Sequence, residues 1–298
     1  MLNFKENRII SFIVVLISYL LAFFGAYFAL NLMKNASFHP LIKILAADII
    51  ATIIIYILSE ILGNASLYDP YWSITPLIIG AYYLLNFSIN NEYLPRIILI
   101  YGIVSIWGMR LTWNWVRGWK NLLQEDWRYR NFRKNYPKLF WFINLTGIQL
   151  LPTIFVYLGC LPLFFAFTDP IQPFNWLDIL GIFISVGAIL IETLSDAQMH
   201  SFVRFRKDRH SIMDRKLWKF SRHPNYFGEV SFWWGIYCFG IAANPNSWWT
   251  ILGALAINLL FIFISVPLMD KYQLSRKPEY FEYKTRTHAL LPIYLSKK

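Results

Sequence analysis

Charged residues are scarce in this chain. Asp, Glu, Lys and Arg make up 15% of its 298 residues, whereas soluble domains average about 25%. Hydrophobic residues reach 57%, above the usual ~45–50%. The composition therefore excludes an ordinary soluble domain. It indicates an integral membrane protein with several spans of about 20 residues each.

Acidic residues are rarer than basic ones. There are 17 Asp and Glu against 28 Lys and Arg, which gives a net charge of +11. The basic residues lie in the gaps between apolar runs, where the cytoplasmic loops of membrane proteins carry them. We therefore expect membrane lipids around the chain and no nucleic-acid partner.

The signatures of several common sites are missing. Cys160 and Cys238 both fall inside apolar runs, so neither a disulfide framework nor a cysteine metal site is implied. The histidines do not have zinc spacing, and we expect no metal site. There is no GxGxxG after a strand and no Walker loop, which excludes the usual nucleotide-binding folds.

Eight apolar runs are candidate membrane spans. They cover residues 9–32, 41–62, 71–89, 95–116, 143–167, 176–200, 224–243 and 248–269. The first is too long for a signal-peptide core and is expected to be retained. The aromatic and basic stretch 117–140 is expected to form an amphipathic helix on the membrane surface.

The distribution of basic residues predicts the orientation. Two lie at the N-terminus, seven after the fourth run, eight after the sixth and seven in the tail. With eight spans, these 24 of the 28 Lys and Arg fall on one side. The positive-inside rule then places both termini in the cytoplasm. The predicted fold is an all-α, polytopic membrane helix bundle of about eight transmembrane helices.

The stretch 217–235 concentrates polar chemistry. Five functional side chains fall within eight residues: Arg222, His223, Asn225, Tyr226 and Glu229. Pro224 predicts a helix start, with Ser221 as a candidate cap. A helix N-terminus beside an arginine suits a phosphate or carboxylate. The alternative is a membrane-helix end with interfacial aromatics.

A second polar feature precedes this stretch. Glu192, Asp196 and His200 recur every four residues, so on a helix they form one stripe. The stripe continues toward Arg204 and Lys207 in a basic loop, as a binding groove would. Ionisable residues inside spans are functional candidates by default.

Ion pairs within the bundle are the alternative explanation for the charges in the spans. Asp196 is a candidate partner for Arg110 in the fourth run. For Asp48, which lies near Lys43 in the second run, a local pair or a lumenal contact is favoured over a functional role.

These motifs resemble a known superfamily. The segments ETLSDAQ (192–198), RHPNYFGE (222–229) and WWG (233–235) resemble the C-terminal region of steroid 5α-reductases. With Asp-Pro-Tyr-Trp at 69–72 and EDWRY at 125–129, the chain is more similar to the bacterial branch of unknown function, DUF1295. The resemblance implies a two-span extension (1–68), a reductase-like domain (69–298) and a bacterial inner-membrane location. Sterol C14 reductases and isoprenylcysteine carboxyl methyltransferases share the RHPNY motif.

The resemblance implies NADPH bound at the cytoplasmic side. Arg204, Arg206 and Lys207 are the implied partners of a 2′-phosphate, and Glu192 stands where steroid reductases have asparagine. Tyr283 lies in a segment, 279–292, that resembles the family's closing segment. The implied cofactor-binding residues are Arg110, Glu192, Asp196, Arg204, Lys207, Arg222, His223, Asn225, Tyr226, Glu229 and Tyr283.

The implied reaction is hydride transfer from NADPH to a conjugated double bond of an apolar, lipid- or steroid-like substrate from the bilayer. The carbonyl oxygen of the substrate becomes an enolate and needs an acid or hydrogen-bond donor. Steroid reductases use a Glu and Tyr pair, whose positions fall near Asp69 and Trp107 here. Two alternatives stay open: an S-adenosylmethionine-dependent membrane methyltransferase, and a non-catalytic lipid- or sterol-binding protein.

Overall fold

The chain folds into two compact helical units. The computed structural model describes residues 5–208 and 210–292. Unit 1 is Met1–Thr168 and unit 2 is Asp169–Lys298. No strand occurs within the described ranges, in agreement with the predicted all-α class. The division at 68/69 that the resemblance implies is a different boundary and stays a prediction.

Unit 1 contains the first five predicted spans or their equivalents. Its helices are α1 (Arg8–Leu32), α2 (Pro40–Leu62), η1 (Ala65–Tyr68), α3 (Tyr71–Asn86), α4 (Leu94–Gly118), α5 (Trp127–Asn135), α6 (Phe140–Ile143), η2 (Asn144–Leu150) and α7 (Leu151–Thr168). The π-helical η2 joins α6 and α7 into one continuous run. The surface helix expected over 117–140 is wrong in extent, because only α5 in that stretch is a separate helix.

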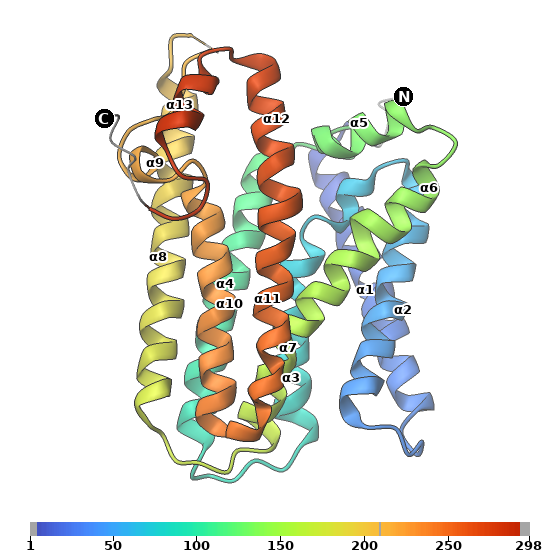
Figure 1. Ribbon diagram of the computed structural model, residues 1–298. Helices are drawn as coiled ribbons and strands as arrows, with labels where there is room; N and C mark the ends of the chain where they lie inside the picture. The colour runs from blue at the N-terminus through green and yellow to red at the C-terminus, as the bar shows by residue number, and fades with distance from the viewer. Residues whose placement is uncertain (1–4, 209, 293–298) are drawn as a thin grey trace. The chain divides into compact units, whose positions relative to one another are not determined.

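Unit 2 contains the remaining helices. They are α8 (Trp176–Phe205), α9 (Leu217–Phe220), α10 (Pro224–Ala243), η3 (Pro245–Thr250), α11 (Ile251–Leu260), η4 (Phe261–Ser265), α12 (Val266–Arg276) and α13 (Tyr280–Arg286). Within the unit, α8, α10 and the continuous run from α11 to α12 lie side by side (Figure 1).

Six helical runs in the described chain are long and apolar enough to cross a membrane. Four of them are α1, α2, α4 and α8. The other two are the continuous runs Phe140–Thr168, which ends with α7, and Pro245–Arg276, which ends with α12. The other two predicted spans correspond to α3, which has 16 residues, and α10, which has 20. The protein is thus a multi-pass membrane protein. The count of eight and the cytoplasmic side of both termini stay predictions.

Asp48 in α2 does not pair with Lys43. The phenol of Tyr71 donates a 2.7 Å hydrogen bond to Asp48 Oδ1, and Lys43 Nζ donates to the carbonyl of Lys34. The predicted local pair is wrong because each side chain has another partner. Asp48 instead joins α2 to α3 inside unit 1, where it is 6% exposed.

Small residues bring α8 and α10 into close contact. A Cβ atom at Gly235 would meet Ser185 Oγ and lie 3.0 Å from the Ser185 nitrogen. One at Gly181 would lie 3.1 Å from the carbonyl oxygen of Gly235. One at Gly228 would lie 2.9 Å from the carbonyl oxygen of Ala188. Backbones approach this closely only where side chains are small, as is common between membrane helices.

Candidate functional site

The polar stretch predicted to carry the chemistry lies at the start of α10. The helix begins at Pro224, as predicted, but its N-cap is His223 and not Ser221. The Ser221 hydroxyl accepts the His223 N–H (3.2 Å) and donates to the carbonyl of Ala289 (3.0 Å). Residues 280–289 are called the C-terminal strap. Ser221 does not cap α10, because its hydroxyl is hydrogen-bonded to this strap.

Backbone hydrogen bonds fix this strap along the start of α10. The Arg222 N–H donates to the His288 carbonyl at 2.9 Å, and the His223 N–H donates to the Ala289 carbonyl at 3.1 Å. The Tyr283 phenol donates to the carbonyl of Ser221 at 3.3 Å. The closing segment suggested by the sequence thus lies against the RHPNY motif.

Asp270, inside α12, organises the motif and the strap. Its carboxylate accepts Arg222 Nη2 at 2.9 Å, His223 Nε2 at 3.1 Å and the Tyr280 phenol at 2.8 Å. Lys284 Nζ lies 3.4 Å from it. A buried carboxylate needs partners of this kind, because losing water costs several kcal/mol. Asp270 was not predicted as a site residue, although an acid directly after an apolar run is a signal for one.

Burial keeps two neighbours of Asp270 uncharged. Burial lowers the pKa of His223, while the hydrogen bond to Asp270 acts in the opposite direction. Burial and the Asp270 carboxylate raise the pKa of Tyr280. Both side chains are therefore neutral near pH 7, and Arg222 is the principal counter-charge of Asp270.

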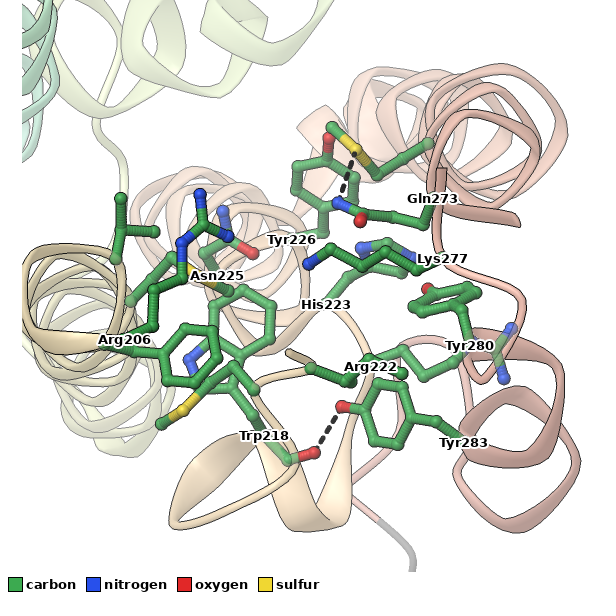
Figure 2. A pocket seen from close by; sticks show the side chains of 16 residues that line it. Arg206, Trp218, Arg222, His223, Asn225, Tyr226, Gln273, Lys277, Tyr280 and Tyr283 are labelled. Carbon is green, nitrogen blue, oxygen red and sulfur yellow. Dashed lines mark hydrogen bonds between the residues drawn. The ribbon is translucent and has the colours of Figure 1, made fainter. Parts of the chain in front are cut away.

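A cavity of about 290 Å³ lies between α8, the start of α10, α12 and the strap. Figure 2 shows its walls. The volume is just below the range of roughly 300–1,000 Å³ that is usual for ligand pockets. The polar and charged residues that line it are Arg206, Arg222, His223, Asn225, Gln273 and Lys277. None of the described lining residues is acidic.

Two cations reach the cavity from different walls. Arg206 follows α8 and Lys277 follows α12, and both extend into the pocket (Figure 2). Burial and the charges of Arg206 and Arg276 lower the pKa of Lys277. Lys277 Nζ donates one hydrogen bond, to the Ser211 carbonyl at 2.9 Å. An anion bound between Arg206 and Lys277 would relieve their repulsion, so the site favours a phosphate group.

Asn225 presents an unused acceptor to this cavity. Among the residues that the structure describes, its Oδ1 atom is buried and has no hydrogen-bond partner. A buried oxygen without a partner costs about 1–3 kcal/mol. A bound ligand with an N–H or O–H donor would satisfy it. The residues present thus fit a nucleotide cofactor, which carries such donors as well as phosphates.

Aromatic rings supply the remaining walls. The Tyr226 ring stacks on His223 with centroids 5.0 Å apart and an interplanar angle of 13°. Trp218 and Tyr283 also line the cavity, and the Trp218 indole donates to the carbonyl of Ser195 at 3.1 Å. Flat apolar faces beside cations suit a ligand with both rings and phosphates.

The expected cofactor residues divide into two groups. Arg222, His223, Asn225, Tyr226 and Tyr283 line the cavity. The others do not line it: Glu192, Asp196, Arg204, Lys207 and Glu229 in unit 2, and Arg110 on α4 in unit 1. Lys277 was not predicted as a site residue, because it lies within the polar tail that follows the last apolar run.

Glu229, the last residue of the motif, and Glu192 of α8 are both buried where α8 and α10 pack together. Glu229 is 4% exposed, and its Oε1 accepts the Trp233 indole N–H at 2.9 Å. Glu192 is 2% exposed and its Cγ packs over Gly228. The glycine of the motif therefore makes room for the glutamate of the stripe.

The two expected catalytic residues belong to unit 1. The Tyr129 phenol donates to Asp69 Oδ1 at 2.9 Å. Burial, and secondarily the nearby Asp126, raise the pKa of Asp69 to about 7. Trp107 is fully buried, and its ring meets that of Trp72 edge to face at 6.1 Å.

The raised pKa of Asp69 predicts a pH-dependent stability. The pKa of Asp69 is about 7 in the folded chain and ~3.9 in an unfolded one. Unfolding at a pH between these two values therefore releases a proton. Stability should fall as pH rises from 5 to 7, by at most about 1.4 kcal/mol per pH unit, and then level off. Thermal unfolding of the wild type and Asp69→Asn at pH 5 and pH 8 checks this. Asp69→Asn should gain stability over the wild type only at pH 8, and equal effects at both pH values would contradict it.

The chain is similar to one protein family and to one curated relative. The family model described as "Protein of unknown function (DUF1295)" matches residues 55–287. The chain belongs to the DUF1295 family. An uncharacterized protein, C594.04c of Schizosaccharomyces pombe, is 25% identical over 251 residues, which cover 77% of this chain and 73% of the yeast protein. No solved structure matches significantly.

The DUF1295 match contains the whole candidate site. Every residue that lines the cavity falls within 55–287, and so do Asp69 and Trp107. The helix α1 and Asp48 lie outside it. The relative found is fungal, so the bacterial location stays a prediction.

Proposed function

We propose that this DUF1295 protein is a membrane-embedded NADPH-dependent reductase that transfers hydride to a conjugated C=C bond of an apolar lipid- or steroid-like substrate. The observation that carries the proposal is the cavity at the start of α10. It combines two cations, Arg206 and Lys277, with aromatic walls and the unused acceptor of Asn225. A bacterial inner membrane is the proposed location.

Each wall of the cavity has a role in binding. Arg206 and Lys277 hold phosphate oxygens, and Tyr226 and Trp218 contact the rings. Asn225 Oδ1 accepts a hydrogen bond from the ligand. When bound, NADPH supplies the hydride. Arg222 and His223 act through Asp270, since their side chains hold the strap that forms one wall.

Asp69 is the proposed acid on the substrate side. Its assignment rests on the resemblance to steroid reductases, and Trp107 would add an indole N–H donor. A pKa of about 7 supports the role, because a half-protonated carboxyl near neutral pH can give up a proton and regain it.

An S-adenosylmethionine-dependent methyltransferase is the second candidate, and the small cavity favours it. The charges oppose it, since S-adenosylmethionine carries a sulfonium cation and an ammonium group against a single carboxylate and is positive overall. No acidic side chain lines the described cavity, and Arg206 and Lys277 would repel both positive groups. NADPH carries the opposite charge and is therefore the preferred ligand.

Ligand-dependent thermal unfolding of the purified protein separates the candidates. NADPH should raise the melting temperature more than NADH at equal concentration, and S-adenosylhomocysteine should have little effect. Stabilisation by S-adenosylhomocysteine alone would favour the methyltransferase. Stabilisation by none of the three would favour a non-catalytic lipid-binding protein.

Lys277→Gln should weaken NADPH binding about tenfold, as expected when one charge-assisted hydrogen bond is lost. Lys271→Gln is the matched control, because Lys271 is an exposed lysine of α12 that does not line the cavity. Isothermal titration with NADPH measures both. Equal affinities of the two variants would show that Lys277 does not contact the cofactor.

A further inference from the structure

The segment that contains α5 is strongly basic, and its acidic residues are already used. Glu125 Oε1 accepts the Ala65 N–H at 2.9 Å and Arg133 Nη2 at 2.8 Å. Asp126 caps α5 and holds the Arg128 guanidinium at 2.8 Å. These contacts neutralise Arg128 and Arg133 inside unit 1.

The other cations of this segment remain on the surface. Arg130 and Lys134 lie on α5, Lys138 follows the end of that helix, and all three are exposed. Within the described ranges, none of them forms an ion pair with an acidic side chain. We call these three residues the basic stripe. Arg130 and Lys134 lie one turn apart on α5, at about 6 Å along the axis.

Exposed apolar side chains lie next to the stripe in the sequence. Tyr136 is 52% exposed, Leu139 56%, Trp141 54% and Phe142 50%. Aromatic residues next to basic ones are typical of the boundary between lipid tails and headgroups. In the ribbon view, α5 lies across one end of unit 1 (Figure 1). Contacts to η1 and Asp69 hold it there.

We propose that the basic stripe, Arg130, Lys134 and Lys138, together with the adjoining aromatic residues, is a binding surface for the headgroups of anionic phospholipids. The charges of the stripe are complementary to lipid phosphates, and the exposed rings reach the interfacial layer. This surface is separate from the cofactor pocket and does not depend on the proposed reductase activity.

Native mass spectrometry of the detergent-purified full chain tests this surface. Phosphatidylglycerol and phosphatidylcholine are titrated onto the wild type, onto the double variant Arg130→Gln/Lys134→Gln and onto the control double variant Arg215→Gln/Lys271→Gln. Each pair removes one exposed arginine and one exposed lysine. The stripe variant should bind phosphatidylglycerol roughly 25-fold more weakly than the wild type, and the control should match the wild type.

Salt provides a second measurement that needs no variant. Raising the ionic strength should weaken phosphatidylglycerol binding to the wild type and leave phosphatidylcholine binding unchanged. The proposal is overturned if the wild type binds both lipids equally, if the stripe variant keeps wild-type affinity, or if the control variant loses as much.

Discussion

Asp270→Ala should abolish NADPH binding and lower the free energy of unfolding by about 3–5 kcal/mol. The variant leaves the buried Arg222 guanidinium without its carboxylate and removes the acceptor of His223 and Tyr280. The strap then loses its attachment to α12, and the cavity loses the wall that carries Tyr280 and Tyr283. Thermal unfolding and NADPH titration of the purified protein measure the two effects.

Asp214→Ala is the matched control for Asp270. Asp214 also pairs with an arginine of the strap, Arg286, at 2.7 Å, but both side chains are about one-third exposed. Exposed pairs contribute about 0–1 kcal/mol, so this variant should resemble the wild type. If the two variants behave alike, Asp270 does not organise the site.

Gly228→Ala should have the second-largest effect. Its Cβ atom would lie 2.9 Å from the carbonyl oxygen of Ala188 and would collide with the buried Glu192 side chain. The helices α8 and α10 must then move apart, which costs about 1–3 kcal/mol for an overpacked contact. The start of α10 moves with them, so NADPH binding should weaken as well.

Gly187→Ala controls for the added methyl group. Gly187 lies on α8, and a Cβ atom there would meet nothing within 4 Å. Because alanine also has the higher helix propensity, this variant should be as stable as the wild type or slightly more stable. Melting temperatures in detergent compare the two. A Gly228→Ala protein as stable as Gly187→Ala would show that the close helix contact is not required.

Much of the helical framework could be predicted from apolar periodicity and proline. The helix α10 runs from Pro224 to Ala243, the bounds that the sequence predicts. The stretch 117–140 could not be predicted in this way. Its backbone between α4 and α5 follows contacts that are distant in sequence, such as the Asn64 amide donating to the Leu122 carbonyl at 2.7 Å.

The candidate site could be predicted only in part, because some of its contacts join residues that are distant in sequence. Asn225 and Tyr226 belong to a local motif, and both line the cavity. Asp270 lies 48 residues from its partner Arg222, and spacing along the chain does not predict a contact of that range. Lys277 meets the cavity only because α12 ends beside the strap.

The most direct test of the central claim is an NADPH titration of three proteins by isothermal calorimetry. These are the wild type, the pocket variant Arg206→Gln/Lys277→Gln and the control variant Arg215→Gln/Lys271→Gln. If the cavity at the start of α10 holds NADPH, the wild type and the control should bind it with the same affinity. The pocket variant should then bind more weakly by more than about tenfold, the loss expected for one charge. The two losses need not add, because both cations contact the same ligand. Absence of binding to the wild type, or equal binding to all three proteins, would contradict the account.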